Sequence, residues 1–176
     1  MGSYQFSFRR YKDEDASNLY QAYQEYTWEN IQPYYSVGIG MDKAQFLEAI
    51  RKYSNKVHRP PIIVDENDVP FGVYHLSYRH ANRYHELAIH LWNHQHLTKA
   101  ILQQILDQVL HEGHPEAHLL LEVPGYAPKL HKAAYELGLE HIGTVPQYLC
   151  HGAELFDKYI YVVTSEKWNS NEFSDL

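Results

Sequence analysis

The strongest pattern of hydrophobic and polar positions lies between Tyr84 and Gly113, and its period changes along the way. Up to Trp92, apolar residues alternate with more polar ones, which is typical of a strand with one apolar face. After the following turn, apolar residues recur at helical spacing as far as Gly113, a residue type that commonly ends helices. A second buried strand follows at Ala117–Val123. The stretch therefore predicts a strand, a helix of about four turns and a strand, joined as a right-handed parallel crossover.

Weaker patterns on either side of this crossover predict shorter elements that turns and loops connect. Further strands are expected at 4–11, 62–64, 70–78, 140–150 and 157–164, and further helices at 13–26, 42–53 and within 125–139. In the last of these helices Leu130, Ala133, Ala134 and Leu137 share one face, and Gly138 ends it. The predicted fold class is α/β (α+β): a mixed, mostly antiparallel sheet of about seven strands, flanked by four helices and splayed at the central parallel pair.

Length and composition narrow the class of protein. The chain has 176 residues, and we expect a single domain at 1–164 followed by a polar tail at 165–176. A formal net charge of −7 without a basic stripe argues against a nucleic-acid partner. The single cysteine, Cys150, excludes an internal disulfide and fits a reducing compartment. Since no apolar run reaches the length of a membrane span, we expect no membrane association and a cytoplasmic location.

The turn inside the crossover is the first candidate for chemistry. It runs from Asn93 to Ala100, at the carboxyl end of the first strand and the N-terminus of the helix. The first N–H groups of a helix have no partner within the helix and carry partial positive charge. Lys99 adds a full positive charge beside them. The turn is therefore suited to a phosphate group.

The order of these elements resembles that of the GNAT superfamily of N-acetyltransferases, over about residues 6–164. Two local sequences carry the resemblance further. The helix end Tyr135–Leu139 is similar to the family's Tyr-Glu-x-Gly-hydrophobic signature, and Asp157–Tyr161 resembles its last strand. The resemblance implies the fold predicted above. It also implies transfer of an acetyl group from acetyl-CoA to a small-molecule or peptide amine.

The family's phosphate-binding motif, Arg/Gln-x-x-Gly-x-Gly/Ala, falls on the crossover turn. Gln95 and Ala100 match it, but Thr98 stands where the family has Gly, and Pro128 stands where it often has Asn. Threonine adds a branched side chain where glycine lets the backbone approach a pyrophosphate, although the backbone N–H groups remain. The resemblance implies contacts with acetyl-CoA at His90, Leu91, Gln95, His96, Leu97, Thr98, Lys99, Ala100 and Pro128.

Two residues are implied for proton transfer. Glu86, on the mixed face of the first crossover strand, would remove the proton of the acceptor ammonium; a strand-end Glu that faces solvent is the open alternative. The resemblance also implies that Tyr135 protonates the leaving thiolate. At about 100° per residue it points away from the apolar stripe, so it is not simply a core aromatic. Its alternative is one more surface Tyr in a Tyr-rich chain. Glu122 is a second base candidate, for which a structural role is favoured.

The sequence also bears on metal binding, on loss of catalysis and on self-association. The 13 histidines are scattered over every element without an HExxH pattern or a cysteine pair, so no metal site is expected. The departures at Thr98 and Pro128 motivate a second hypothesis of another class, a catalytically inactive GNAT-like binding or regulatory module. A homodimer is also left open.

Overall fold

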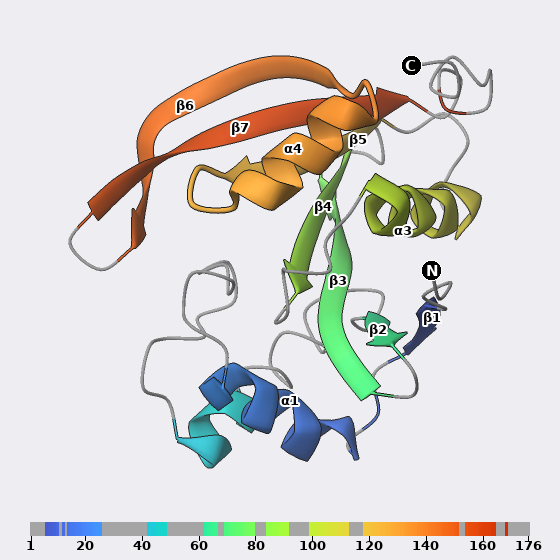
Figure 1. Cartoon of the computed structure of the whole chain (residues 1–176), viewed down its shortest axis with the longest axis vertical. Helices are drawn as coiled ribbons and strands as arrows, with labels where there is room; N and C mark the ends of the chain where they lie inside the picture. Colours follow the sequence, from blue (N-terminus) through green and yellow to red (C-terminus); the bar gives the residue numbers. More distant parts are fainter. Residues whose placement is uncertain are drawn as a thin grey trace, which may run out of the picture. The chain divides into compact units, whose positions relative to one another are not determined.

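The computed structural model describes residues 6–10, 12, 14–25, 42–48, 62–66, 69–79, 84–91, 99–112, 118–151, 154–164 and 168. Its strands follow the order β1-β2-β3-β4-β5-β7-β6 in a seven-stranded sheet, with the labels used in Figure 1. The elements are β1 (Phe6–Arg10), α1 (Asp15–Glu25), β2 (Ile62–Glu66), β3 (Val69–Arg79), β4 (Tyr84–Leu91), α3 (Lys99–Glu112), β5 (His118–Pro124), α4 (Pro128–Glu136), β6 (Glu140–His151) and β7 (Glu154–Thr164). In addition, residues 43–48 are helical.

The crossover predicted from the change of period is present. β4 and β5 pair in parallel, with Tyr84–Leu87 in register with His118–Leu121. β5 then continues to Pro124 and pairs along its whole length with β7, antiparallel. The ladders of β1 with β2, β2 with β3 and β6 with β7 are antiparallel as well. The predicted fold class, a mixed and mostly antiparallel sheet with a central parallel pair, is confirmed.

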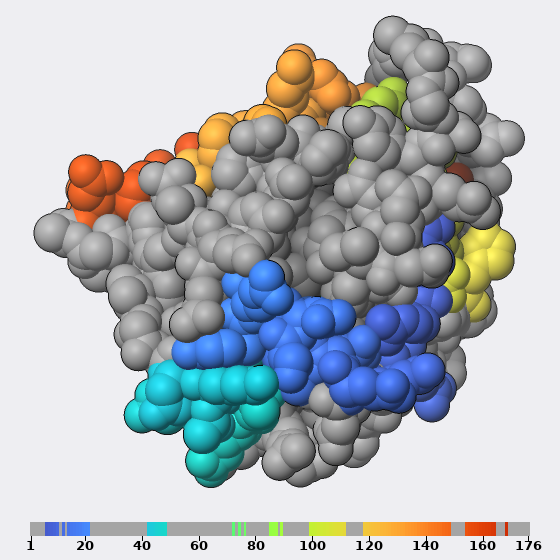
Figure 2. Space-filling model, turned by 60° about the horizontal axis from the view of Figure 1, so that its bottom comes forward, coloured from blue at the N-terminus to red at the C-terminus, as the bar shows by residue number. Residues whose placement is uncertain are grey.

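Contacts divide the chain into two compact units, of which the first comprises residues 1–75 and 89–94. In this unit Asp15 is the first residue of α1. Its carboxylate accepts two hydrogen bonds from the Arg9 guanidinium, at 2.8 and 2.7 Å, and one from the Lys12 N–H. Asp42 and Gln45 exchange hydrogen bonds as a capping box, which confirms the predicted start of the second helix. Figure 2 shows α1 and residues 43–48 adjoining on one face. The predicted cap Asp13 lies outside the described residues.

The second unit comprises residues 76–88 and 95–176 and contains α3 and α4. Its core is built from the apolar stripes of these two helices and from alternate residues of the strands. The core residues include Leu87, Ile101, Leu102, Ile105, Leu106, Val109, Leu119, Leu121, Val123, Leu130, Ala133, Ala134 and Leu137. The predicted inward face of α4 is therefore confirmed, and Gly138, at φ 70°, ends the helix in the left-handed conformation that favours glycine.

The last two strands form a long ribbon beside α4 (Figure 1). β7 begins at Glu154, before the expected start at 157, because its pairing with β6 extends to His151. β6 is irregular: its register against β7 shifts between Val145 and Leu149, where Gln147 has a φ of 50°. In the tail, the Trp168 indole N–H donates to the Asp107 carboxylate of α3 at 2.7 Å, so part of the tail docks.

Candidate functional site

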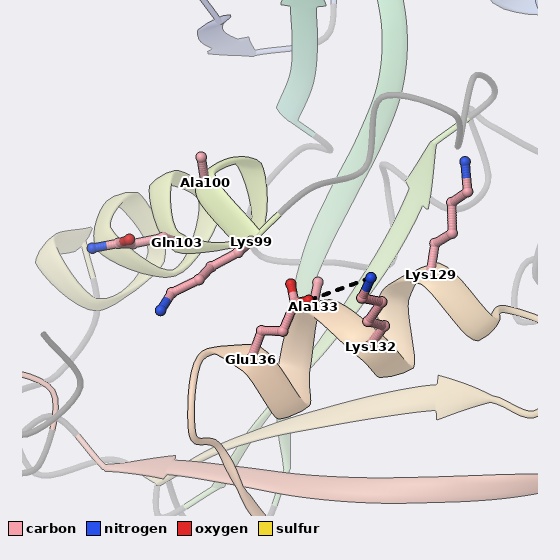
Figure 3. A pocket seen from close by; sticks show the side chains of 7 residues that line it. All are labelled: Lys99, Ala100, Gln103, Lys129, Lys132, Ala133 and Glu136. Carbon is pink, nitrogen blue, oxygen red and sulfur yellow. Dashed lines mark ion pairs between the residues drawn. The ribbon is translucent and has the colours of Figure 1, made fainter. Parts of the chain in front are cut away.

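A groove of about 540 Å³ lies between the outer flanks of α3 and α4 (Figure 3). Both helices present an apolar stripe to the sheet, and the polar residues beside these stripes form its walls. The first turns of α3 contribute one wall and the length of α4 contributes the other. The lining residues are Lys99, Ala100, Gln103, Lys129, Lys132, Ala133 and Glu136. The groove thus opens at the N-terminus of α3, where helical N–H groups favour an anion.

The charge of this groove is positive, although the chain as a whole is negative. Among the residues that the structure describes, three lysines line it against a single carboxylate, that of Glu136, in a chain with a net charge of −7. Lys132 approaches Glu136 at 3.5 Å, one turn away on α4, and its side chain is 75% exposed. An exposed pair of this kind contributes little energy, so Lys132 can turn toward a ligand at small cost. The groove is suited to a ligand with several phosphate charges.

The structure places some of the residues expected to contact a cofactor and not others. Lys99 and Ala100 line the groove, and Pro128 is the first residue of α4, next to Lys129. His90 and Leu91 lie at the end of β4, in the part of that strand that belongs to the first compact unit. Four expected contacts lie outside the described residues: Gln95, His96, Leu97 and Thr98.

Tyr135 lies on α4 but does not line this groove. Its side chain is 78% exposed, in agreement with the prediction that it points away from the apolar stripe. At about 100° per residue, it is turned well away from its neighbour Glu136 and toward the flank of α4 that carries His131. Tyr135 is therefore accessible to solvent and is not among the residues that line the groove.

Glu86 lies on the opposite side of the sheet from α4. Leu87 is in register with Leu121, and Leu121 with Tyr161, whose hydroxyl lies 2.9 Å from His131 Nδ1 on α4. Residues in register share a face, so this row faces α4. Glu86 precedes Leu87 and points the other way, where it is half-buried. The sheet thus separates the groove from the carboxylate that was expected to act as a base.

Helix α4 also carries a half-buried histidine, His131. His131 packs its ring against Tyr159, at 4.5 Å between centroids, and meets the Tyr161 hydroxyl. Burial, and after it the charge of nearby His141, lowers the pKa of His131 below its ordinary value of 6.5. His131 is therefore neutral at pH 7, which makes it a poor proton donor at that pH.

Four of the seven described residues that line the groove were not predicted from the sequence. Gln103, Lys129, Lys132 and Glu136 were not singled out, although Lys129 and Lys132 stand three residues apart on one helix flank. That spacing shows that the two lysines are neighbours, but only the packing of α4 against α3 shows what they face. Among the described residues, no group of three or more His, Cys, Asp or Glu could hold a metal ion. Within the same residues, no helix is long and apolar enough to cross a membrane.

Comparisons with solved structures identify the architecture. Mutant forms of the spermidine/spermine N-acetyltransferase of Vibrio cholerae match with a TM-score of 0.72 at 16% identity, over 95% of this chain and 98% of that one. An N-acetyltransferase from Staphylococcus aureus matches with a TM-score of 0.68 at 14% identity, over 92% and 99%. The chain has the GNAT N-acetyltransferase fold.

Another match is a dodecameric structure of the Vibrio cholerae spermidine N-acetyltransferase. Its TM-score is 0.72 at 14% identity, over 96% of this chain and 98% of that one. No protein-family model matches the chain, and no curated protein sequence matches it. At these identities the GNAT likeness concerns the fold alone, so activity has to be argued from the residues of the site.

Proposed function

We propose that the protein is an N-acyltransferase that uses acetyl-CoA to acetylate an amine. The observation that carries the proposal is the groove at the N-terminus of α3, where Lys99, Lys129 and Lys132 gather in an otherwise acidic chain. CoA carries a pyrophosphate and a third phosphate, the chemistry that lysines and helix N-termini bind. The GNAT fold supports the proposal, since the similar solved structures include N-acetyltransferases.

In the proposed reaction, groups on the two sides of the sheet have different roles. On the α4 side, the lysines and the first backbone amides of α3 would hold the phosphates. Acetyl-CoA supplies the activated acetyl group. On the other side, Glu86 would accept the proton of the acceptor ammonium, so that the amine can attack. Tyr135 would donate a proton to the thiolate as the carbon–sulfur bond breaks. This assignment keeps base and acid on separate groups.

Calorimetry with CoA tests the groove directly. We expect the parent to bind CoA and acetyl-CoA, and Lys129→Met/Lys132→Met to weaken binding by roughly 10-fold, because two exposed cations are lost. Lys12→Met, a substitution of the same chemistry in the other compact unit, should leave affinity unchanged. Thiol release with a panel of amines then establishes transfer. A parent that binds no CoA at millimolar concentration would rule out the proposal.

Tyr135→Phe tests the proton donor. The substitution removes only a hydroxyl from a 78% exposed side chain, so folding and CoA affinity should barely change. If Tyr135 protonates the thiolate, turnover should fall by about 10²-fold, the low end for a general acid, because a thiolate already leaves fairly well. The measurement is single-turnover thiol release at saturating acetyl-CoA. Unchanged turnover would leave solvent water as the proton donor.

A second candidate is a module that binds CoA or a related nucleotide without transferring an acetyl group. The exposure of Tyr135, which does not line the groove, favours it, as does threonine in place of glycine at Thr98. The two candidates share the groove and differ in the reaction. CoA binding without thiol release, across amines of several classes, would select the module.

The acceptor and the assembly are proposed more coarsely. We propose a small-molecule or peptide amine as acceptor and a self-association of the chain. Among the described strands β6 is one of the two edges of the sheet, with Ile142 52% exposed on it, and one structure of similar fold is dodecameric. Light scattering coupled to gel filtration gives the mass in solution, and a monomer at all concentrations would remove this part. The cytoplasmic location stays a prediction.

A further inference from the structure

A cluster of three side chains on β5, β6 and β7 has no place in the reaction as proposed so far. Lys158 Nζ lies 3.0 Å from Glu122 Oε1 and 4.1 Å from the centre of the Tyr148 ring. The side chains of Lys158 and Glu122 are only 10% and 15% exposed, whereas Tyr148 is 58% exposed. A charged pair is thus enclosed in the sheet, with an aromatic ring over its ammonium.

This cluster shares a sheet face with Glu86. Glu86 is in register with Leu120 of β5, and Glu122 follows two residues later, so the two carboxylates point to the same side. That side is opposite α4, because Leu121, in the row between them, faces α4 through Tyr161. The groove for the proposed cofactor lies on the α4 side. An acceptor amine therefore has to approach from the side of Glu86 and the cluster.

Glu122 also lies at the carboxyl end of the parallel pair. The register of β5 with β4 ends at Leu121, and Glu122 is the next residue, paired with Ile160 of β7. Sheets with parallel strands bind ligands at the carboxyl ends of those strands. The cluster is thus placed where the two substrates of the proposed reaction have to meet.

The ammonium of Lys158 has capacity to bind more than Glu122. An ammonium has three N–H donors, and among the residues that the structure describes Glu122 is the single hydrogen-bond acceptor for Lys158. The Tyr148 ring covers another direction. A buried ion pair with few hydrogen bonds contributes little to stability, because desolvation cancels most of the attraction. The donors of Lys158 are therefore suited to an oxygen atom that arrives with a ligand.

The backbone around the cluster is constrained in a way that fixes Tyr148. Gln147, the preceding residue, has a φ of 50°, and its N–H donates to the Asp157 carboxylate at 2.9 Å. The Gly125 N–H donates to the Asp157 carbonyl at 2.7 Å, and a Cβ on Gly125 would come within 3.0 Å of that oxygen. A left-handed non-glycine residue is costly, and such positions cluster at functional sites. The irregular part of β6 thus holds a ring over Lys158.

We propose that Lys158, fixed by Glu122 and covered by Tyr148, binds a carbonyl or carboxylate oxygen of the acceptor. This inference rests on the proposed acetyltransferase function and names its substrate class: an amine with an oxygen acceptor close to it, as in a peptide or amino-acid amine. Glu86 receives the ammonium, and Lys158 receives the oxygen. A polyamine carries no oxygen, so it makes no use of Lys158.

The first experiment compares acceptors with the parent protein. The panel holds an alanyl dipeptide amide, an alkylamine of equal length without carbonyl groups, and spermidine, all at saturating acetyl-CoA. We expect kcat/KM for the peptide amine to exceed that for the alkylamine by about 10- to 100-fold, the value of a hydrogen bond from a charged donor. Equal values for the two, or a preference for spermidine, overturn the inference while leaving the transferase function in place.

The second experiment removes the pair without leaving a buried charge. Lys158→Met/Glu122→Leu replaces both side chains by apolar ones, and circular dichroism verifies the fold. The peptide preference should disappear, whereas the kcat/KM for the alkylamine changes by less than about 3-fold and CoA affinity is kept. Lys12→Met serves as the control. An equal loss for every acceptor means a structural role and overturns the inference. If the double variant does not fold, Lys158→Leu/Glu122→Met, which also removes both polar groups, replaces it under the same criteria.

Failure of the proposed function is visible separately. A parent that binds no CoA, or releases no thiol with any amine, removes the transferase and the inference together. A parent that acetylates the alkylamine but shows no preference for the peptide amine removes the inference alone.

Discussion

Two lysine–glutamate pairs in the second compact unit differ in almost every physical respect. Lys132 and Glu136 are one turn apart on α4, with nitrogen and oxygen at 3.5 Å and side chains 75% and 42% exposed. Lys158 and Glu122 come from neighbouring strands, meet at 3.0 Å and are nearly buried. The first pair lines the groove, and the second lies on the opposite side of the sheet.

The different burial of the two pairs suits them to different tasks. Solvent and salt screen the attraction within the exposed pair, so each of its side chains can leave the other and bind water or a phosphate instead. The buried pair has lost its hydration, and neither partner can leave without exposing an uncompensated charge to the protein interior. The exposed pair is therefore suited to binding a mobile anion, and the buried pair to holding one ammonium in a fixed position.

Breaking the buried pair should have the largest effect on stability. Glu122→Gln leaves the Lys158 ammonium without its counter-ion, and we expect the free energy of unfolding to fall by roughly 3 kcal/mol. Glu136→Gln, the matched change in the exposed pair, should alter it by less than about 0.5 kcal/mol. Urea denaturation of both variants measures the difference. Similar values for the two would show that burial does not distinguish these pairs.

The Arg9–Asp15 pair offers an intermediate case, with side chains 34% and 7% exposed. Asp15→Asn should cost about 2 kcal/mol at pH 7, because two charge-assisted hydrogen bonds from Arg9 and one from the Lys12 N–H weaken. The hydrogen bonds from Arg9, more than the other contacts, hold the pKa of Asp15 below its ordinary value of 3.8.

This pair also has a defined pH dependence. A depressed folded-state pKa means that the stabilisation is complete above the ordinary carboxyl pKa and is lost as pH falls through the folded value. The difference in unfolding free energy between the parent and Asp15→Asn should stay constant from pH 7 to about pH 5 and shrink below pH 3.8. Urea titrations at several pH values measure it. A difference that persists unchanged at the lowest pH would show that the charge of Asp15 is not its source.

The smallest effects are expected at the exposed pair, and they concern affinity. Lys132→Met should weaken CoA binding by about 2- to 5-fold, and Glu136→Gln should strengthen it by about 2-fold, because the groove gains net positive charge. Both effects should diminish at high salt, since these charges are exposed. Calorimetry at low and high ionic strength gives the comparison. Salt-independent changes would contradict the view that the groove binds through screened surface charges.

The sequence predicted the fold correctly because the fold depends on local periodicity. The change from period two to helical spacing after Trp92 defined the crossover, and the spacing of Leu130, Ala133, Ala134 and Leu137 defined the buried face of α4. Gly138 marked the end of that helix. The sequence predicted the candidate site only in part. Lys99 and Ala100 were expected at the site, but Lys129, Lys132 and Gln103 were not. A helical pattern shows which residues are buried, but not which neighbour the remaining faces meet.

By itself, the sequence determined the elements, the parallel crossover and the chemical character of each face, because these follow from the order of side chains along one segment. Tertiary structure decided which segments face one another. It brought lysines from two helices into one groove, and it placed Glu122 and Lys158, which are far apart in sequence, within 3.0 Å. The physical reason is that a charge pair or a binding groove depends on distances across the fold, and strand register and helix packing set those distances.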